Sequence, residues 1–444
     1  MELIINKKLR SFFSILQSNI LTGILIFLFI LIIFPFDVKA QKPPEWPNFH
    51  GPERTNKSKE KGIIKSWSAA GPELLMTISG LGEGYSSVII ADGMLFTAGM
   101  TNNQSFIYAF DLNGKLIWKK PNGKAWETTM SWASSYTGTR GTPTYDNGIV
   151  YHLAELGRLA AFDSKTGREL WNRELMTEFN AGIPEYGYAE SVLIDGDMLY
   201  CNPAGKKGFI ACFNKLNGKL IWVNSEINGL ASYNSSVIME FGGYRQVVSL
   251  SSKNVFGVDS KTGKLLWTMN FENSHKLNNT DPIIYKEYVF VSSGYGKGSM
   301  MIKLTTSGSE MKPSLVWETN LMDNHHGGVI FHENKLYGTG SNSRGLFCFD
   351  FMTGNQHWKS DGKGSLTFAD GMLYLLDEKG IMNLVKAVPE KYELTGTFKV
   401  PQGGKGMYWA HPVVCDKMLY IRHTDKLFVY NLNVPGETKK RVGL

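Results

Sequence analysis

The feature that most constrains the fold is a short pattern that the chain repeats, of the form F-D-x-x-x-G-x-x-x-W. Two weaker copies end at Trp317 and Phe398, and five clear ones lie at 110–118, 162–171, 213–222, 258–267 and 349–358. Each copy predicts a strand, a tight Asn-Gly or Thr-Gly turn and a second strand, because glycine accepts the positive φ of such turns. The final aromatic residues recur every 40 to 53 positions. Such a period, with four short strands per unit, is typical of a β-propeller.

A second pattern, two apolar strands joined by an Asp-Gly-type turn, precedes the first one and supplies the other two strands of each blade. It is clearest at 87–96, 191–200, 366–374 and 412–420. Third strands can be counted eight times but fourth strands only seven, so the last blade needs an edge from elsewhere. Residues 71–78 have the character of that strand, with Met76 at the tryptophan position. We predict an all-β, eight-bladed propeller of four-stranded antiparallel blades, closed by an N-terminal strand, with seven blades as the alternative.

The two ends of the chain divide it further. Residues 1–40 join a basic start to an apolar run and end at Ala40, which predicts an export signal or, alternatively, an uncleaved membrane anchor. Residues 41–70 predict an extended arm that packs on the ring, because Trp46 and Phe49 lie between prolines. The propeller is expected over 71–434, followed by a basic tail at 435–444.

Charge and cysteine placement exclude some functions. The formal net charge is +7 without a long basic run, so we expect no nucleic-acid partner. We expect a monomer that contacts a membrane only through an uncleaved N-terminal segment. Cys212 and Cys348 occupy a repeat position that is otherwise small, which predicts buried thiols, although a disulfide between Cys201 and Cys212 stays open. No zinc-type cysteine spacing is present.

The candidate site lies where the innermost strands begin, because these positions converge at one mouth of a propeller. Five residues before each turn stand Ser87, Thr142, Glu190, Ser236, Asp281, Gly328, Ser365 and His411. Two residues earlier stand Tyr85, Arg140, Tyr188, Asn234, Asn279, His326, Lys363 and Trp409. Their variety favours a binding funnel over packing, with a water-filled channel as the alternative. The predicted ligand-binding residues are Tyr85, Arg140, Tyr188, Glu190, Asn234, Asp281, His325, His326, Trp409 and His411.

The D-x-x-T-G-K-x-x-W copies resemble the repeats of quinoprotein-like propellers over nearly all of residues 71–434. This family includes pyrroloquinoline-quinone-dependent alcohol dehydrogenases and the outer-membrane-assembly propeller lipoprotein. Five further motifs resemble an exported bacterial subfamily, in which many members have Arg where this chain has His50; they lie at 46–52, 188–191, 292–296, 324–328 and 409–412. The resemblance implies a location in the bacterial envelope, periplasmic or anchored and facing the periplasm.

The resemblance implies two alternative functions. The one we favour is a non-catalytic propeller that binds a small molecule, a glycan or an envelope protein at one mouth. The other is an oxidoreductase that uses pyrroloquinoline quinone and calcium on an alcohol or a sugar, with Glu190, Asn234 and Asp281 as calcium ligands and Glu190 or Asp281 as general base. In that case Trp409 would stack on the quinone and Arg140 would meet a carboxylate.

Two departures from the dehydrogenase pattern weaken the second function. The chain has neither an adjacent cysteine pair nor a C-x-x-C-H haem motif. His325, His326 and His411 form a further candidate set for a transition metal.

Overall fold

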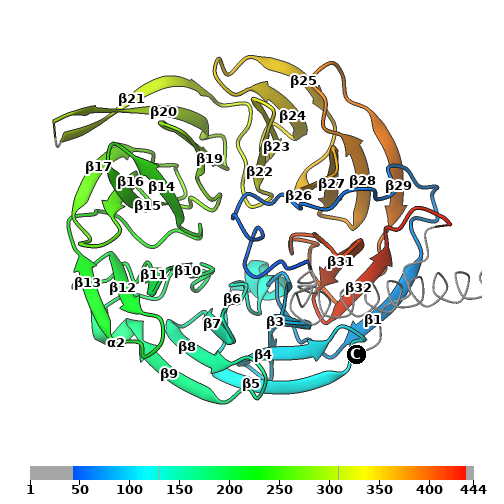
Figure 1. Ribbon diagram of the computed structural model, residues 1–444, viewed down its shortest axis with the longest axis horizontal. Helices are drawn as coiled ribbons and strands as arrows, with labels where there is room; N and C mark the ends of the chain where they lie inside the picture. The colour runs from blue at the N-terminus through cyan, green and yellow to red at the C-terminus, as the bar shows by residue number, and fades with distance from the viewer. Residues whose placement is uncertain (1–43, 129, 309, 437–444) are drawn as a thin grey trace, which may run out of the picture. The chain divides into compact units, whose positions relative to one another are not determined.

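The computed structural model describes residues 44–128, 130–308 and 310–436. The predicted export segment and nearly all of the basic tail lie outside these residues. The described residues from 44 to 436 belong to one compact unit, in which the chain runs around a ring of sheets (Figure 1). Within the described ranges, no helix has the length and apolar character needed to cross a membrane.

The ring consists of eight four-stranded antiparallel sheets, which confirms the predicted eight-bladed propeller. In each blade the first strand is innermost. The strands of the first four blades are β2 (Ile89–Ala91), β3 (Met94–Thr101), β4 (Gln104–Asp111) and β5 (Leu116–Lys124); β6 (Thr144–Asp146), β7 (Ile149–Leu153), β8 (Arg158–Asp163) and β9 (Glu169–Glu174); β10 (Leu193–Asp195), β11 (Met198–Cys201), β12 (Ile210–Asn214) and β13 (Leu220–Asn224); β14 (Val237–Phe241), β15 (Tyr244–Leu250), β16 (Asn254–Asp259) and β17 (Leu265–Asn270).

The last four blades follow the same order until the ring closes. Their strands are β18 (Ile283–Tyr285), β19 (Tyr288–Ser293), β20 (Gly298–Ser307) and β21 (Glu310–Thr319); β22 (Val329–His332), β23 (Lys335–Gly340), β24 (Gly345–Asp350) and β25 (Gln356–Ser360); β26 (Gly364–Ala369), β27 (Met372–Asp377), β28 (Ile381–Lys386) and β29 (Leu394–Lys399); β30 (Val413–Cys415), β31 (Met418–His423), β32 (Lys426–Asn431) and β1 (Leu74–Ser79). The N-terminal strand β1 thus completes the last blade, as predicted, with Met76 opposite Val429.

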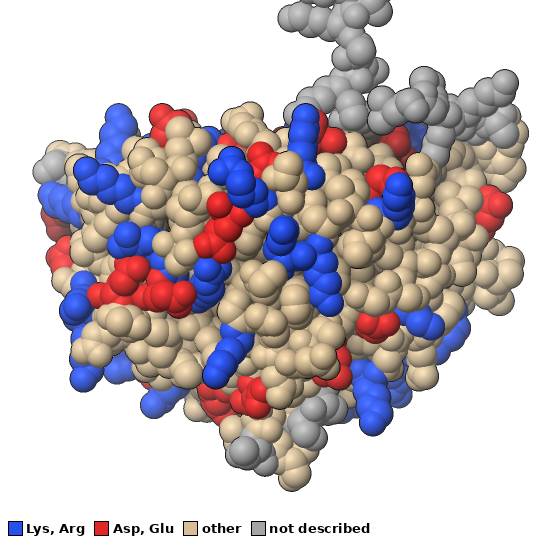
Figure 2. Space-filling model, turned by 90° about the horizontal axis from the view of Figure 1, so that it is seen from below, with Lys and Arg blue, Asp and Glu red and all other residues tan. Residues whose placement is uncertain are grey.

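Among the described residues, two short helices lie in the connections between blades. The 3-10 helix η1 (Ser131–Tyr136) lies in the long connection between the first two blades. Helix α2 (Leu175–Phe179) follows β9 and buries Leu175 and Phe179 against the third blade. On the side of the ring that Figure 2 shows, basic and acidic side chains are interspersed.

The repeated pattern joins neighbouring blades. Asp163 fixes the turn before β9 by accepting hydrogen bonds from the N–H and hydroxyl of Thr166. Gly167 then has φ of +66° and lies on the indole of Trp118 from the preceding blade, where a Cβ would come within 2.7 Å of the ring. The Trp118 indole also donates to the carbonyl of Ser164 at 2.8 Å. The pattern therefore encodes a contact between blades.

The seventh blade departs from the sequence prediction, which placed Phe398 at the tryptophan position. In other blades, the tryptophan pairs with the residue of the third strand that stands just before a β-bulge. In the seventh blade Gly396 makes this pairing, so Gly396 is the equivalent residue. A side chain from the arm fills the space, because a Cβ on Gly396 would lie 2.6 Å from the Trp67 ring. Trp67 lies 6.0 Å from Tyr374 at 50°, close to the 6.0 Å and 44° of Trp358 and Tyr337.

The four cysteines are free and buried. Cys201 lies opposite Ala211, and Cys212 lies opposite Tyr200. Neighbouring positions on a strand point to opposite faces of the sheet, so the two thiols enter different core clusters. This geometry settles the open question in favour of buried thiols.

Candidate functional site

The arm that precedes β1 crosses the axis of the ring, as the dark blue trace in Figure 1 shows. It enters along the first blade, where Trp46 exchanges two backbone hydrogen bonds with Ile90. It leaves along the seventh, where Ser58 donates to the carbonyl of Phe368. Extended segments add to exposed strand edges in this way. The arm therefore covers the inner edges of two blades and occupies the centre between them.

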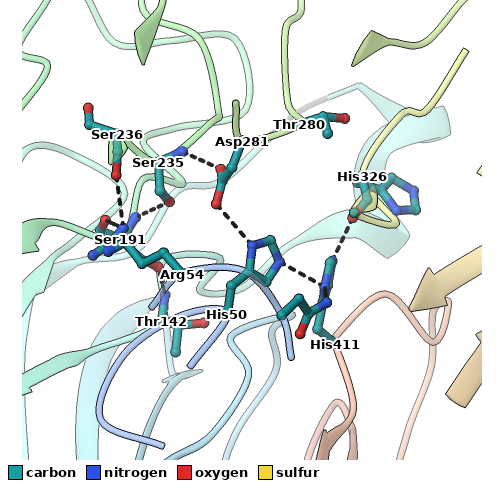
Figure 3. A network of polar contacts seen from close by, with 12 residues as sticks. His50, Arg54, Thr142, Ser191, Ser235, Ser236, Thr280, Asp281, His326 and His411 are labelled. Carbon is teal, nitrogen blue, oxygen red and sulfur yellow. Dashed lines mark hydrogen bonds and ion pairs between the residues drawn. The ribbon is translucent and has the colours of Figure 1, made fainter. Parts of the chain in front are cut away.

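A chain of polar contacts links the arm to the fifth, eighth and sixth blades (Figure 3). His50 Nδ1 lies 3.1 Å from Asp281 Oδ2, and His50 Nε2 lies 3.0 Å from His411 Nδ1. His411 Nε2 lies 2.6 Å from the carbonyl oxygen of His326. All of these side chains are buried or nearly so.

The directions of these bonds fix the tautomer of His411. A carbonyl only accepts, so His411 must carry its proton on Nε2, and burial holds the pKa of His411 well below its usual value. Its Nδ1 is then an acceptor, and His50 must donate from Nε2. The other ring nitrogen of His50, Nδ1, faces the Asp281 carboxylate at 3.1 Å.

Arg54 is the second polar residue that the arm brings to the centre, after His50. It is buried, and its guanidinium donates to the carbonyl oxygens of Ser191, Val192 and Ser236. Burial lowers the pKa of Arg54 to about 10, while the charges of Asp281 and Glu190 oppose that shift. The arm thus brings a positive charge close to the two buried carboxyl groups of Asp281 and Glu190.

The three candidate calcium ligands use their oxygens within the protein. Glu190 accepts from the backbone and side-chain nitrogens of Asn202, and burial raises the pKa of Glu190 to about 8. Asn234 Oδ1 accepts from Ser249, and Asp281 faces Ser235 and His50. Calcium prefers several ionised oxygens around one point, whereas here a guanidinium supplies the positive charge. These residues do not fit a calcium site, and the described residues contain no cluster of three or more His, Cys, Asp or Glu that could hold a metal.

Hydroxyl groups join the blades around the arm. The N–H groups of Ser87, Thr142 and Ser191 donate to side-chain hydroxyls of the next blade, on Thr142, Ser191 and Ser235. The N–H of Ser235 continues the series to Asp281. Ser87 and Thr142, the hydroxyl residues of this series that stand five positions before the turn, are therefore explained by contacts between blades.

A cavity of about 510 Å³ lies where the loops before the innermost strands converge. We call it the funnel. It is lined by Phe49, Tyr85, Tyr136, Arg140, Tyr186, Ala189, Ser191, Tyr233, Leu277, Asn279, Tyr295, His325, His326, Ser341, Lys363, Glu378, Met407, Trp409 and His411. A second cavity of about 510 Å³ borders the arm residues 48–57 and the strands β10, β14 and β18. The arm, with Phe49 and His411, forms the floor of the funnel.

The structure divides the predicted ligand-binding residues into two groups. Six of them line the funnel, namely Tyr85, Arg140, His325, His326, Trp409 and His411. The other four are buried elsewhere. Tyr188 donates its hydroxyl to the carbonyl of Pro203 at 2.6 Å, and Asn234 donates to Leu250. Asp281 borders the arm-side cavity, and Glu190 is bound to Asn202.

Several funnel residues were missed by the sequence prediction, above all Tyr136, Tyr186, Tyr233, Tyr295 and Glu378. Tyr186 and Tyr233 lie in the same connecting loops as predicted residues, two and one positions before them, so a wider window on those loops would have found them. Tyr295 belongs to a motif at 292–296 that was recognised without a role. Tyr136 lies in η1, which has no counterpart in the repeats.

Arg140 positions a wall of the funnel. It donates to the carbonyl oxygens of Gly138 and Tyr136, and its guanidinium lies 4.9 Å from the Trp126 ring. These contacts hold the connection that carries Tyr136, whose ring stacks on Trp409 at 5.1 Å. Arg140 is thus already committed to protein partners and is not free to meet a ligand carboxylate.

Comparisons with known proteins agree with the propeller. The outer membrane protein assembly factor BamB of Nitrosomonas eutropha is 25% identical over 240 residues, which cover 50% of this chain and 52% of that protein. The chain thus matches about half the length of that relative. Solved structures of BamB from Moraxella catarrhalis and of a quinohemoprotein alcohol dehydrogenase from Comamonas testosteroni share the fold. Their TM-scores are both 0.59, at 13% and 12% identity, covering 81% and 91% of this chain and 100% and 82% of theirs.

A family model described as "Outer membrane protein assembly factor BamB" matches residues 103–360, which is more than half of the chain. This match confirms the predicted kinship with PQQ-type repeat propellers. The chain belongs to the family of the outer membrane protein assembly factor BamB.

Proposed function

We propose that this protein is a non-catalytic binding propeller of the bacterial cell envelope, which holds a ligand or a partner in the funnel. The observation that carries the proposal is the funnel itself. All eight loops that lead into the innermost strands contribute unlike aromatic and polar side chains to one cavity. Packing within a repeat calls for one residue type, whereas recognition uses different side chains at equivalent positions.

The envelope location rests on the family. Relatives such as the protein from Nitrosomonas eutropha are named as outer membrane assembly factors. By analogy, the partner class is another component of the envelope, and the predicted export segment would deliver the chain there. The absence of a fitting calcium site, with Arg54 in the place where a metal would supply charge, favours binding over quinone-dependent oxidation.

A photo-crosslinking experiment tests the proposal. A benzophenone amino acid replaces Met407, which lines the funnel and is exposed, and the full-length chain is expressed in its native envelope. We expect an adduct that disappears when Trp409 is also changed to Ala. Met352 is a matched control, because it is equally exposed on the turn before β25, far from the funnel. Equal labelling from Met352 and Met407, or no adduct from Met407, would contradict the proposal.

A further inference from the structure

The wall of the funnel presents flat aromatic faces held in fixed positions. The Tyr136 ring stacks on the Trp409 indole, with the ring centroids 5.1 Å apart and an angle of 23° between the planes. The centroid of the Tyr85 ring lies 5.0 Å from the same indole. The Trp409 indole donates to Glu378 Oε1 at 3.0 Å. Rigid rings of this kind provide large contact area at a low cost in conformational entropy. The ligand must therefore offer flat apolar faces.

Another aromatic residue of the funnel, Tyr295, has a strained backbone. Tyr295 has φ of +58°, a region that bulky residues seldom adopt. Its ring stacks on His275 at 4.0 Å, and the next residue, Gly296, donates to Asp323 Oδ2 at 2.9 Å. Strain that the surrounding structure maintains is concentrated at functional sites. The position of Tyr295 is thus an independent indication that this cavity binds something.

The charges that line the funnel are already compensated. Lys363 Nζ lies 3.1 Å from Glu378 Oε1. Although burial alone would raise the pKa of Glu378, the neighbouring His326 and Lys363 lower it to about 2. Burial also lowers the pKa of His326, so that its ring is neutral near pH 7. Arg140 donates to backbone carbonyls, and the charge of the buried Glu155 opposes the lowering of the Arg140 pKa by burial. Each charge in the funnel therefore has a partner of opposite sign, which leaves no unpaired charge for an ionic ligand.

Three buried polar atoms of funnel residues lack a hydrogen-bond partner among the described residues, namely Asn279 Oδ1 and both ring nitrogens of His326. His326 Nε2 faces Glu378 Oε1 at 3.5 Å, which leaves Asn279 Oδ1 and His326 Nδ1 as two acceptors open to a ligand. A buried acceptor without a donor is costly, so a ligand that donates to it gains that free energy. Hydroxyl groups on an uncharged ligand are the donors that suit these two sites.

The floor of the funnel decides how the ligand enters. Phe49 of the arm and His411 line it, and the arm crosses the axis of the ring at this point. A polymer therefore cannot pass through the ring, and its end reaches deepest into the funnel. The end of a polypeptide carries an amino or carboxylate charge, for which the funnel has no counter-charge. The end of a neutral sugar chain has flat C–H faces, several hydroxyls and no charge. On these grounds, and resting on the proposed function, we infer that the funnel binds the uncharged end of a glycan chain.

The test uses purified protein from residue 41 and an array of neutral oligosaccharides, oligosaccharides that contain uronic acids, and tyrosine- and proline-rich peptides. The best glycan is then titrated by calorimetry. We expect binding to neutral glycans only, and at least a tenfold increase in Kd for Trp409→Ala. Tyr136→Ser, in a surface connection, should act in the same direction if Trp409→Ala proves unstable. Phe331→Ala, which removes an aromatic ring from the arm-side cavity, should leave Kd unchanged.

Binding of peptides or acidic glycans in preference to neutral ones would overturn the inference, as would an array without any neutral glycan bound. Neutral-glycan binding that Phe331→Ala abolishes and Tyr136→Ser leaves intact would also overturn it. The crosslinking experiment at Met407 separates the two levels. An adduct there with a blank glycan array rejects the glycan and keeps the binding propeller, whereas neither signal rejects both.

Discussion

At the scale of single residues, Trp67 shows how the ring completes a repeat that its sequence leaves incomplete. The fourth strand of the eighth blade comes from the N-terminus, so no turn of that blade can cover the seventh. The arm supplies Trp67 over Gly396 and places Gly71 on the Phe398 ring instead. A tryptophan from outside the repeat thus takes the place of the missing one.

Trp67→Ala should therefore destabilise the protein. Trp67 is only partly buried, so we expect the free energy of unfolding to fall by about 2 kcal/mol, below the loss of about 3 to 5 kcal/mol for fully buried aromatic residues. Denaturant unfolding followed by circular dichroism measures the change. Ser66→Ala, at an exposed neighbouring position, should change stability by less than about 0.5 kcal/mol. An equally small effect of Trp67→Ala would show that the indole does not replace the repeat tryptophan.

His152 makes stability depend on pH at the same scale. It is buried, its Nδ1 accepts from Asn122, and burial lowers its pKa from the usual value to about 4. Between this value and about 6.5, the unfolded chain binds a proton that the folded chain does not. Stability from His152 is thus complete above about pH 6.5 and is lost as the pH falls toward 4.

His152→Gln removes the titrating group while keeping a donor and an acceptor. Between pH 7 and pH 4, we expect the wild type to lose about 3 kcal/mol more unfolding free energy than this variant. Urea unfolding at both pH values gives the difference. Parallel losses in the two proteins would mean that His152 is not the group responsible.

At the scale of elements, the arm is held by polar contacts rather than by a large apolar face. The contact between His50 and Asp281 joins it to the fifth blade, and Arg54 joins it to the third and fourth. In Asp281→Asn, the new amide can donate to His50 Nδ1 while its oxygen still accepts from Ser235. Asp281→Leu can do neither.

Hydrogen exchange of residues 46–58 should distinguish these variants. We expect exchange close to wild type in Asp281→Asn and clearly faster exchange in Asp281→Leu, because the buried His50 then lacks its partner. Exchange of β30 to β32 serves as an internal control and should change little. Fast exchange in both variants would mean that the carboxylate charge itself, and not a polar contact to His50, holds the arm.

The sequence patterns predict elements well wherever a local rule repeats. Met76 could be placed in the fourth strand of the last blade because the spacing of the tryptophans that follow it in the chain sets the register. Phe398 was misplaced because its role depends on Trp67, a contact between residues more than 300 positions apart. Tyr188 and Asn234 lie in the same loops as true funnel residues, but the sequence gives no sign that their side chains turn toward buried partners.

At the scale of the whole molecule, the arm crosses the centre of the ring, and a separate cavity borders it on each side. Arg54 of the arm lies close to the carboxyl groups that the quinone-dependent alternative would assign to calcium. The resemblance to dehydrogenases led to that assignment, because sequence alone cannot show that Arg54 lies between blades far ahead of it in the chain. The central claim is therefore that these carboxylates hold the arm and that the funnel alone binds.

A calorimetric titration tests this claim most directly. Purified protein is titrated with micromolar pyrroloquinoline quinone, with calcium and with a chelator in its place. We predict no calcium-dependent binding in the wild type, because Asn202, Ser235 and His50 occupy the carboxylate oxygens that the ion needs. Micromolar binding that requires calcium and disappears in Glu190→Ala would contradict the account.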